Sequence, residues 1–115
     1  MKARLWHNPR CSKSRETLAI LQGSGAEIEE RRYLENPPSE DELRAALEAL
    51  GVPARALIRK GEAVYKALGL GDPGLSEDAL VAAMAAHPIL IERPVVFTEK
   101  GARLGRPPEA VREIL

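Results

Sequence analysis

The sequence predicts a single α/β domain that spans residues 1–115. Three observations indicate this class: a strand–helix–strand pattern opens the chain, helix signals fill its middle, and two short β-favouring runs lie near its end. A chain of this length is long enough to bury one hydrophobic core and too short for two. We therefore expect one compact unit built around one sheet.

The N-terminal part of the chain predicts a β-α-β unit. An apolar run over residues 3–7 favours a short strand, and residues 12–22 place apolar side chains at helical spacing until Gly23 interrupts them. Residues 26–33 are mostly charged, which is typical of an exposed edge strand. A helix that joins two strands in this way makes the strands parallel and the crossover right-handed.

The middle of the chain predicts several helices. Ser39 and Glu42 form the signature of a capping box, and apolar residues follow at helical spacing until Gly51. Ser76 precedes two acidic residues, which predicts the N-terminus of another helix. We expect this helix to span residues 76–86 and to bury Leu80, Val81 and Met84. Between the two capped helices, the sequence predicts a short helix or turn over residues 54–60 and a helix over residues 63–68.

The end of the chain predicts a β-hairpin and a terminal helix. Residues 95–97 and 102–104 favour strands, and residues 99–101 between them favour a turn. Pro107 and Pro108 are tolerated in the first turn of a helix and open one that runs to residue 114. Together with the β-α-β unit, the hairpin completes a mixed four-stranded sheet. This order is typical of a thioredoxin-like fold with a helical insertion before the hairpin.

The composition limits the classes of partner. Seventeen basic residues balance seventeen acidic ones, so no net charge attracts nucleic acid or an anionic membrane. No apolar run has membrane-spanning length, and the N-terminus lacks the apolar core of a signal peptide. One Cys cannot form an internal disulfide, and with two His it makes no metal-ligand set. We expect a cytoplasmic monomer without a metal or a bound cofactor.

The single cysteine, Cys11, lies between the first predicted strand and the first predicted helix. The N-terminus of a helix carries partial positive charge, and Arg10, Lys13 and Arg15 add cations nearby. Both features stabilise a thiolate, which is the nucleophilic form of the side chain. This setting favours a reactive thiol over a small buried apolar residue.

Two common classes of cysteine chemistry do not fit the spacing. Ser14 occupies the second position of a Cys-x-x-Cys pair, and a hydroxyl can hydrogen-bond a thiolate but cannot resolve a disulfide. Thr17 stands where the arginine of a Cys-x5-Arg phosphatase loop would be. Turnover at Cys11 would therefore use a thiol from another molecule. We expect His7, Ser14 and Arg15 to tune the thiolate, although His7 equally suits the end of the first strand.

Five motifs occur in order along the chain: HNPxCxxSR at residues 7–15, YLENPP at 33–38, RALIRK at 55–60, HPILIERP at 87–94 and GRPP at 105–108. In this order they resemble the glutaredoxin-coupled arsenate reductase family, over nearly the whole chain. Ser12-Lys13 stands where characterised members often have Gly-Thr, and the chain ends at Leu115 where those proteins continue. The sequence therefore resembles a shorter, arsenate-reductase-like branch.

The resemblance implies an oxidoreductase that reduces arsenate to arsenite. It assigns Cys11 as the nucleophile that forms an arsenic–sulfur ester, and Pro94 as a cis-proline facing it. It assigns Arg59, Arg93 and Arg106 to the oxyanion, and guanidinium groups offer paired donors that suit tetrahedral oxygens. Glutathione, a co-substrate, then adds at arsenic, and glutaredoxin reduces the mixed species.

Two other functions stay open at this point. A glutathione-linked thiol–disulfide oxidoreductase would use the arginines to bind a carboxylate of glutathione. A non-enzymatic regulator of the thioredoxin fold would bind RNA polymerase. The absence of a Cys-x-x-Cys switch and the retained arginines favour the arsenate reductase.

Overall fold

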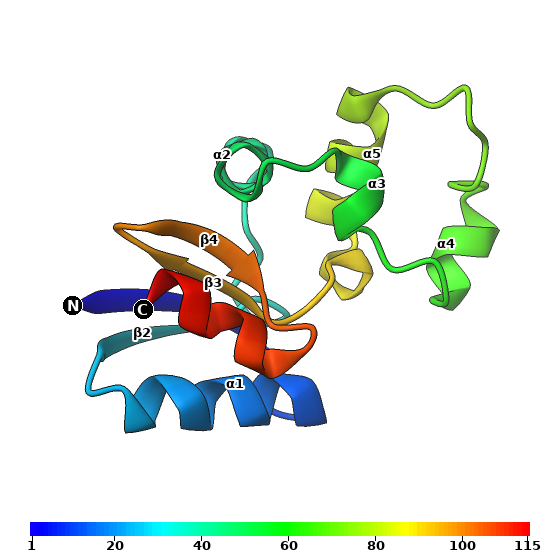
Figure 1. Ribbon diagram of the computed structural model, residues 1–115. Coiled ribbons are helices and arrows are strands. Elements are labelled where there is room, and N and C mark those ends of the chain that lie inside the picture. Colours follow the sequence, from blue (N-terminus) through cyan, green and yellow to red (C-terminus); the bar gives the residue numbers. More distant parts are fainter. The chain divides into compact units, whose positions relative to one another are not determined.

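The computed structural model describes residues 1–115, which fall into two compact units. The first unit comprises Met1–Asn36 and Arg93–Leu115, and the second comprises Pro37–Glu92. The first unit holds the sheet and the second holds the helices inserted between its halves in the sequence (Figure 1). That the whole chain acts as one domain stays a prediction.

A mixed four-stranded sheet forms the first unit, as predicted. Its strands are β1 (Lys2–His7), β2 (Glu27–Arg32), β3 (Val95–Thr98) and β4 (Gly101–Leu104). Their spatial order is β2-β1-β3-β4, so the charged strand β2 is an edge strand. The β1–β2 pair is parallel, whereas the β1–β3 and β3–β4 pairs are antiparallel. The predicted β-α-β unit and hairpin are thereby confirmed.

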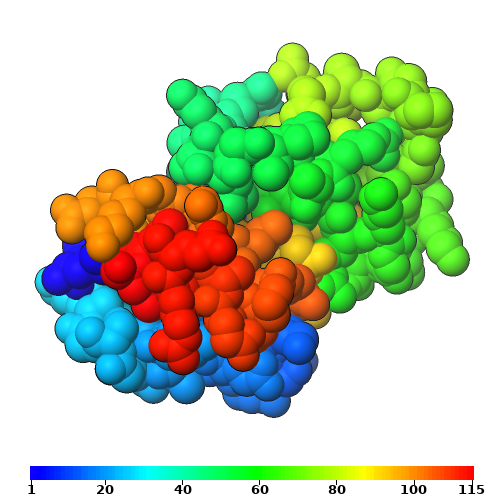
Figure 2. Space-filling model, in the orientation of Figure 1, coloured from blue at the N-terminus to red at the C-terminus, as the bar shows by residue number.

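Two helices cover one face of this sheet and bury the core of the first unit. They are α1 (Ser12–Gly23) and the 3₁₀ helix η2 (Pro108–Ile114). The two helices contact each other, and Figure 2 shows α1 in blue beside η2 in red. Alternate residues of a strand point to the same face, which brings the apolar side chains of β1 and β3 onto the helices. The buried core consists of Ala3, Leu5, Leu21, Val96, Val111 and Ile114.

The second unit is helical, as predicted. Its elements are α2 (Glu40–Leu50), α3 (Ala54–Leu57), α4 (Ala63–Ala67), α5 (Glu77–Ala86) and the 3₁₀ turn η1 (Pro88–Leu90). The capping box at the start of α2 is confirmed, because Ser39 and Glu42 exchange side-chain-to-backbone hydrogen bonds of 3.0 and 3.1 Å. The predicted burial of Leu80, Val81 and Met84 in α5 is also confirmed.

The structure differs from the prediction where a partner distant in sequence intervenes. Helix α3 ends at Leu57, because Ile58 pairs with Ile91 in an antiparallel bridge and holds the backbone extended. The 3₁₀ turn η1 lies directly before Ile91, and the sequence did not predict it. The terminal helix forms as a 3₁₀ helix, a distinction that the sequence signals do not draw. No helix in the structure combines the length and apolar character needed to cross a bilayer.

Candidate active site

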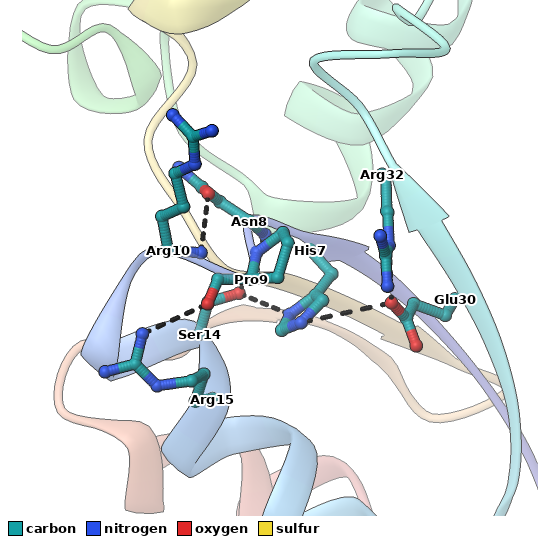
Figure 3. Close-up of polar contacts among 8 residues, drawn as sticks. All are labelled: His7, Asn8, Pro9, Arg10, Ser14, Arg15, Glu30 and Arg32. Atoms are coloured by element: carbon teal, nitrogen blue, oxygen red, sulfur yellow. Dashed lines mark hydrogen bonds and ion pairs between the residues drawn. The ribbon is translucent and has the colours of Figure 1, made fainter.

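The loop between β1 and α1 places Cys11 at the start of a helix. Asn8 shapes this loop, because its side-chain Oδ1 accepts a 3.0 Å hydrogen bond from the Arg10 N–H (Figure 3). The Asn8 carbonyl accepts a second hydrogen bond, also 3.0 Å long, from the Cys11 N–H. Cys11 is the N-cap residue of α1, with its side chain half-buried. The Cys11 carbonyl accepts the first helical bond from the Arg15 N–H. The helix therefore presents its free N–H groups around the sulfur.

The side chain of Ser14 lies beneath this loop and is fully buried. Its Oγ lies 2.7 Å from Nδ1 of His7 and accepts a 3.0 Å hydrogen bond from the Asn8 N–H (Figure 3). The hydroxyl thus joins the end of β1 to the first turn of α1. The sequence suggested that this hydroxyl bonds the thiolate, whereas in the structure its partners are His7 and Asn8.

His7 is buried and belongs to a polar chain that reaches the sheet edge. Its Nε2 lies 3.9 Å from a carboxylate oxygen of Glu30, which pairs in turn with Arg32 at 3.3 Å (Figure 3). Burial lowers the pKa of His7, and the charges of Arg32 and Arg15 lower it further, while Glu30 opposes them. The imidazole is therefore neutral at pH 7.

The thiol of Cys11 has a lowered pKa. Its partial burial acts to raise the pKa, but hydrogen bonds from the backbone N–H of Ser14 and from the Arg93 guanidinium outweigh this effect. The positive charge of Arg93 and the backbone N–H of Lys13 lower the pKa further. Ser14 and Lys13 thus act on the sulfur through the backbone at the helix N-terminus, as expected for an anion at that position.

Two arginines from the C-terminal part of the first unit lie at the sulfur. The Nε and Nη1 atoms of Arg93 are buried, and the Arg93–Pro94 peptide bond is cis, the isomer that the resemblance predicts there. Arg106 donates from Nε to the Arg93 carbonyl at 2.8 Å, and its Nη2 lies 3.7 Å from Sγ of Cys11. The structure therefore brings a thiol and two guanidinium groups together.

A close backbone approach accompanies this arrangement, and sequence reasoning did not find it. The N–H of Gly105 donates to the Pro94 carbonyl at 2.9 Å. A Cβ atom on Gly105 would clash with Oγ1 of Thr17 and with Cγ of Pro94. The segment that carries Arg106 thus lies directly against helix α1 and Pro94. The glycine of the GRPP motif was the only available signal.

Two predicted residues have other partners. Arg15 donates from Nη1 to the Pro9 carbonyl at 3.0 Å, so its guanidinium stabilises the loop, and a role in tuning the thiol stays a prediction. Arg59 belongs to the second unit, where it pairs with Glu62 and Glu92. Its predicted role in binding the oxyanion also stays a prediction. No group of three or more His, Cys, Asp or Glu side chains in the structure is placed to hold a metal ion.

Comparison with known proteins identifies the family. The sequence model of the ArsC family matches residues 6–114, which is nearly the whole chain. The chain belongs to the ArsC family. ArsC relatives among curated proteins include YfgD of Escherichia coli K12, described as uncharacterized, which is 50% identical over 99% of this chain and 97% of its own length. An arsenate reductase of Escherichia coli is 47% identical over 96% of this chain and 79% of its own length.

The ArsC fold is also found in solved structures. A structure described as the arsenate reductase from Vibrio cholerae superposes with a TM-score of 0.97 at 53% identity, covering 100% of this chain and 98% of that one. An ArsC family related protein from Bacteroides fragilis superposes with a TM-score of 0.86 at 27% identity, covering 100% of both chains. The thioredoxin-like fold predicted from the order of elements is thereby confirmed.

Proposed function

We propose that this protein is an arsenate reductase in which Cys11 is the nucleophile, with glutathione and glutaredoxin as the external thiol donors. The observation that carries the proposal is the half-buried thiol at the start of α1, with a lowered pKa and with guanidinium groups from Arg93 and Arg106 beside it. Full-length similarity to arsenate reductases supports the choice of substrate.

The proposed chemistry balances with two external thiols. The Cys11 thiolate forms a bond to arsenic, and one arsenate oxygen leaves as water. Glutathione then bonds at arsenic as a second oxygen leaves as water. The glutaredoxin thiol attacks the sulfur of glutathione, which breaks the bond between that sulfur and arsenic and leaves its electron pair on arsenic. Arsenic has then gained two electrons, and the two donor thiols end as a mixed disulfide. Water displaces the trivalent arsenic from the Cys11 sulfur, which releases arsenite and regenerates the thiol. No bound cofactor is needed for this sequence.

The charged groups suit each stage of this reaction. Cationic donors beside the sulfur keep it ionised and hold the oxyanion near it. The same donors face the negative charge that builds on the oxygens when sulfur attacks, and such stabilisation is usually the largest contribution to catalysis. The proposal also includes Arg59 as a residue that binds the oxyanion, because the resemblance assigns it that role.

We further propose that the protein acts as a cytoplasmic monomer, and that residues 1–115 work as one domain. A free reactive thiol needs a reducing compartment, which the cytoplasm provides. Size-exclusion chromatography with light scattering checks the oligomeric state, and the mass of a single chain is the expected result.

The assay that tests the function measures arsenite formed from arsenate by the purified protein. Glutathione and glutaredoxin are supplied together and then omitted one at a time. We expect arsenite only when both donors are present. Failure to form arsenite with both donors, combined with turnover of a glutathione mixed disulfide, would contradict the proposal and favour the thiol–disulfide oxidoreductase instead.

A further inference from the structure

The pairing of β1 with β2 sets His7 beside two charged side chains. His7 pairs with Arg32 in the parallel register, and Leu5, two residues earlier, pairs with Glu30. Residues two apart in a strand project to the same face, so His7, Glu30 and Arg32 share one face of the sheet. The His7 side chain is only 3% exposed, whereas the Glu30 side chain is 33% exposed on the edge strand. A carboxylate that solvent reaches thus lies beside a buried ring.

The hydrogen bonds of Ser14 decide which nitrogen of His7 carries a proton. The buried Ser14 Oγ has two partners, Nδ1 of His7 at 2.7 Å and the backbone N–H of Asn8 at 3.0 Å. The Asn8 N–H can only donate, so the hydroxyl proton goes to Nδ1, which must then be an unprotonated acceptor. Burial lowers the pKa of His7, so the ring is neutral at pH 7 and carries one proton. That proton is therefore on Nε2.

The Nε2 atom of His7 faces the Glu30 carboxylate. It lies 3.9 Å from Oε1 of Glu30, and Nε of Arg32 donates to the same oxygen at 3.3 Å and anchors it (Figure 3). A carboxylate attracts an N–H and repels the lone pair of a nitrogen. The other tautomer would turn a lone pair toward Glu30 and would leave the Ser14 hydroxyl proton without Nδ1 as an acceptor. Glu30 therefore favours the same tautomer that the Ser14 hydrogen bonds require.

We propose that Glu30 is a positioning residue that holds the His7 ring with its proton on Nε2, and thereby commits the Ser14 hydroxyl proton to His7 rather than to the Cys11 thiolate. The thiolate is an alternative acceptor in the same helical turn, because the backbone N–H of Ser14 already hydrogen-bonds the sulfur. A thiolate that accepts fewer hydrogen bonds is the stronger nucleophile, since nucleophilicity falls as the pKa of a thiol falls. This inference rests on the proposed function, which makes Cys11 the attacking group.

Long-range proton–nitrogen correlation NMR of the isotope-labelled protein shows which ring nitrogen of His7 carries the proton. The chain has two His residues, and His7→Gln identifies the His7 signals by their loss. The parent should carry the proton on Nε2. Glu30→Gln puts an amide of the same size in place of the carboxylate, and because this amide can donate to Nε2, the proton should move to Nδ1 in most molecules. Glu30→Asp keeps the negative charge and should keep the parent tautomer.

The rate of Cys11 alkylation against pH measures the consequence for the thiol. In Glu30→Gln the Ser14 hydroxyl is free to donate to the thiolate, so the midpoint should fall by about one pH unit, the scale of one hydrogen bond to a charged group. Glu30→Gln combined with Ser14→Ala lacks this hydroxyl, so its midpoint should match that of Ser14→Ala alone.

Glu29→Gln is the matched control, because Glu29 lies on the opposite face of β2, where it pairs with Lys2 at 3.2 Å. It removes the same charge and should leave the tautomer and the midpoint unchanged. A proton on Nδ1 in the parent, or one that stays on Nε2 in Glu30→Gln, would overturn the inference. So would a midpoint that falls equally with and without the Ser14 hydroxyl. Both measurements are made without arsenate, so these outcomes are distinct from a failure to reduce it.

Discussion

Arg106 joins the thiol of Cys11 to the backbone of Arg93. Its Nε donates to the Arg93 carbonyl at 2.8 Å while its Nη2 lies 3.7 Å from the Cys11 sulfur. The Arg93 guanidinium in turn hydrogen-bonds the same sulfur and lowers its pKa. The pKa of the thiol is therefore lowered both by the backbone N–H groups of Ser14 and Lys13 at the start of α1 and by Arg93, which lies more than eighty positions away in the sequence.

Arg93→Ala should raise the pKa of Cys11, because it removes both a hydrogen bond and a positive charge from the thiolate. The rate of alkylation by iodoacetamide against pH reports this pKa. In the parent, the midpoint should lie below the ~8.5 of a free cysteine, and in the variant it should move upward. Turnover of arsenate should fall by roughly 10²-fold or more. Arg112→Ala, which removes an exposed cation from η2, is the control. Equal midpoints in the parent and Arg93→Ala would exclude this role for Arg93.

Ser14→Ala should destabilise the fold without greatly changing the thiol. The substitution leaves the buried Asn8 N–H and the His7 ring without the hydroxyl that they share, at a cost of about 1–3 kcal/mol. The backbone N–H that acts on Cys11 is retained. Urea unfolding measures the loss of stability, and Ser12→Ala, at an exposed position of the same helix turn, is the control. A large rise in the alkylation midpoint with unchanged stability would instead assign the hydroxyl to the thiolate.

His7 should make the stability of the protein depend on pH. Because burial lowers its pKa in the folded protein, the unfolded chain binds a proton at a higher pH, near ~6.5, than the folded chain does. The free energy of unfolding should therefore decrease as the pH falls below ~6.5, by up to about 1.4 kcal/mol per pH unit for one proton.

Comparison of urea unfolding at pH 7.5 and pH 5.5 tests this dependence. The difference between the two pH values should be smaller in His7→Gln than in the parent. An identical pH dependence in the parent and His7→Gln would show that another group controls it.

Much of the fold could be predicted because its signals are local. Ser39 and Glu42 lie three residues apart, so their capping box is visible in the sequence and is found in the structure. The order of strands and helices was enough to predict the mixed sheet, because a β-α-β unit permits one arrangement of its strands. The end of α3 was missed because it depends on Ile91, which lies far along the chain.

The candidate site could be predicted by residue type but not by contact. The motifs indicated Cys11, Arg93 and Arg106, and the structure places these three side chains together. The partners of Ser14 and Arg59 could not be predicted, because each depends on packing between separate segments. A polar side chain with several possible partners is assigned only when the fold brings one of them within hydrogen-bond distance.

The most direct test of the central claim compares arsenite formation by the parent and by Cys11→Ser, with arsenate, glutathione and glutaredoxin all present. Serine keeps the size of the side chain but is a far weaker nucleophile than the thiolate. We expect steady arsenite release by the parent and a rate for Cys11→Ser that equals the rate without protein. Equal rates for the parent and Cys11→Ser would contradict it.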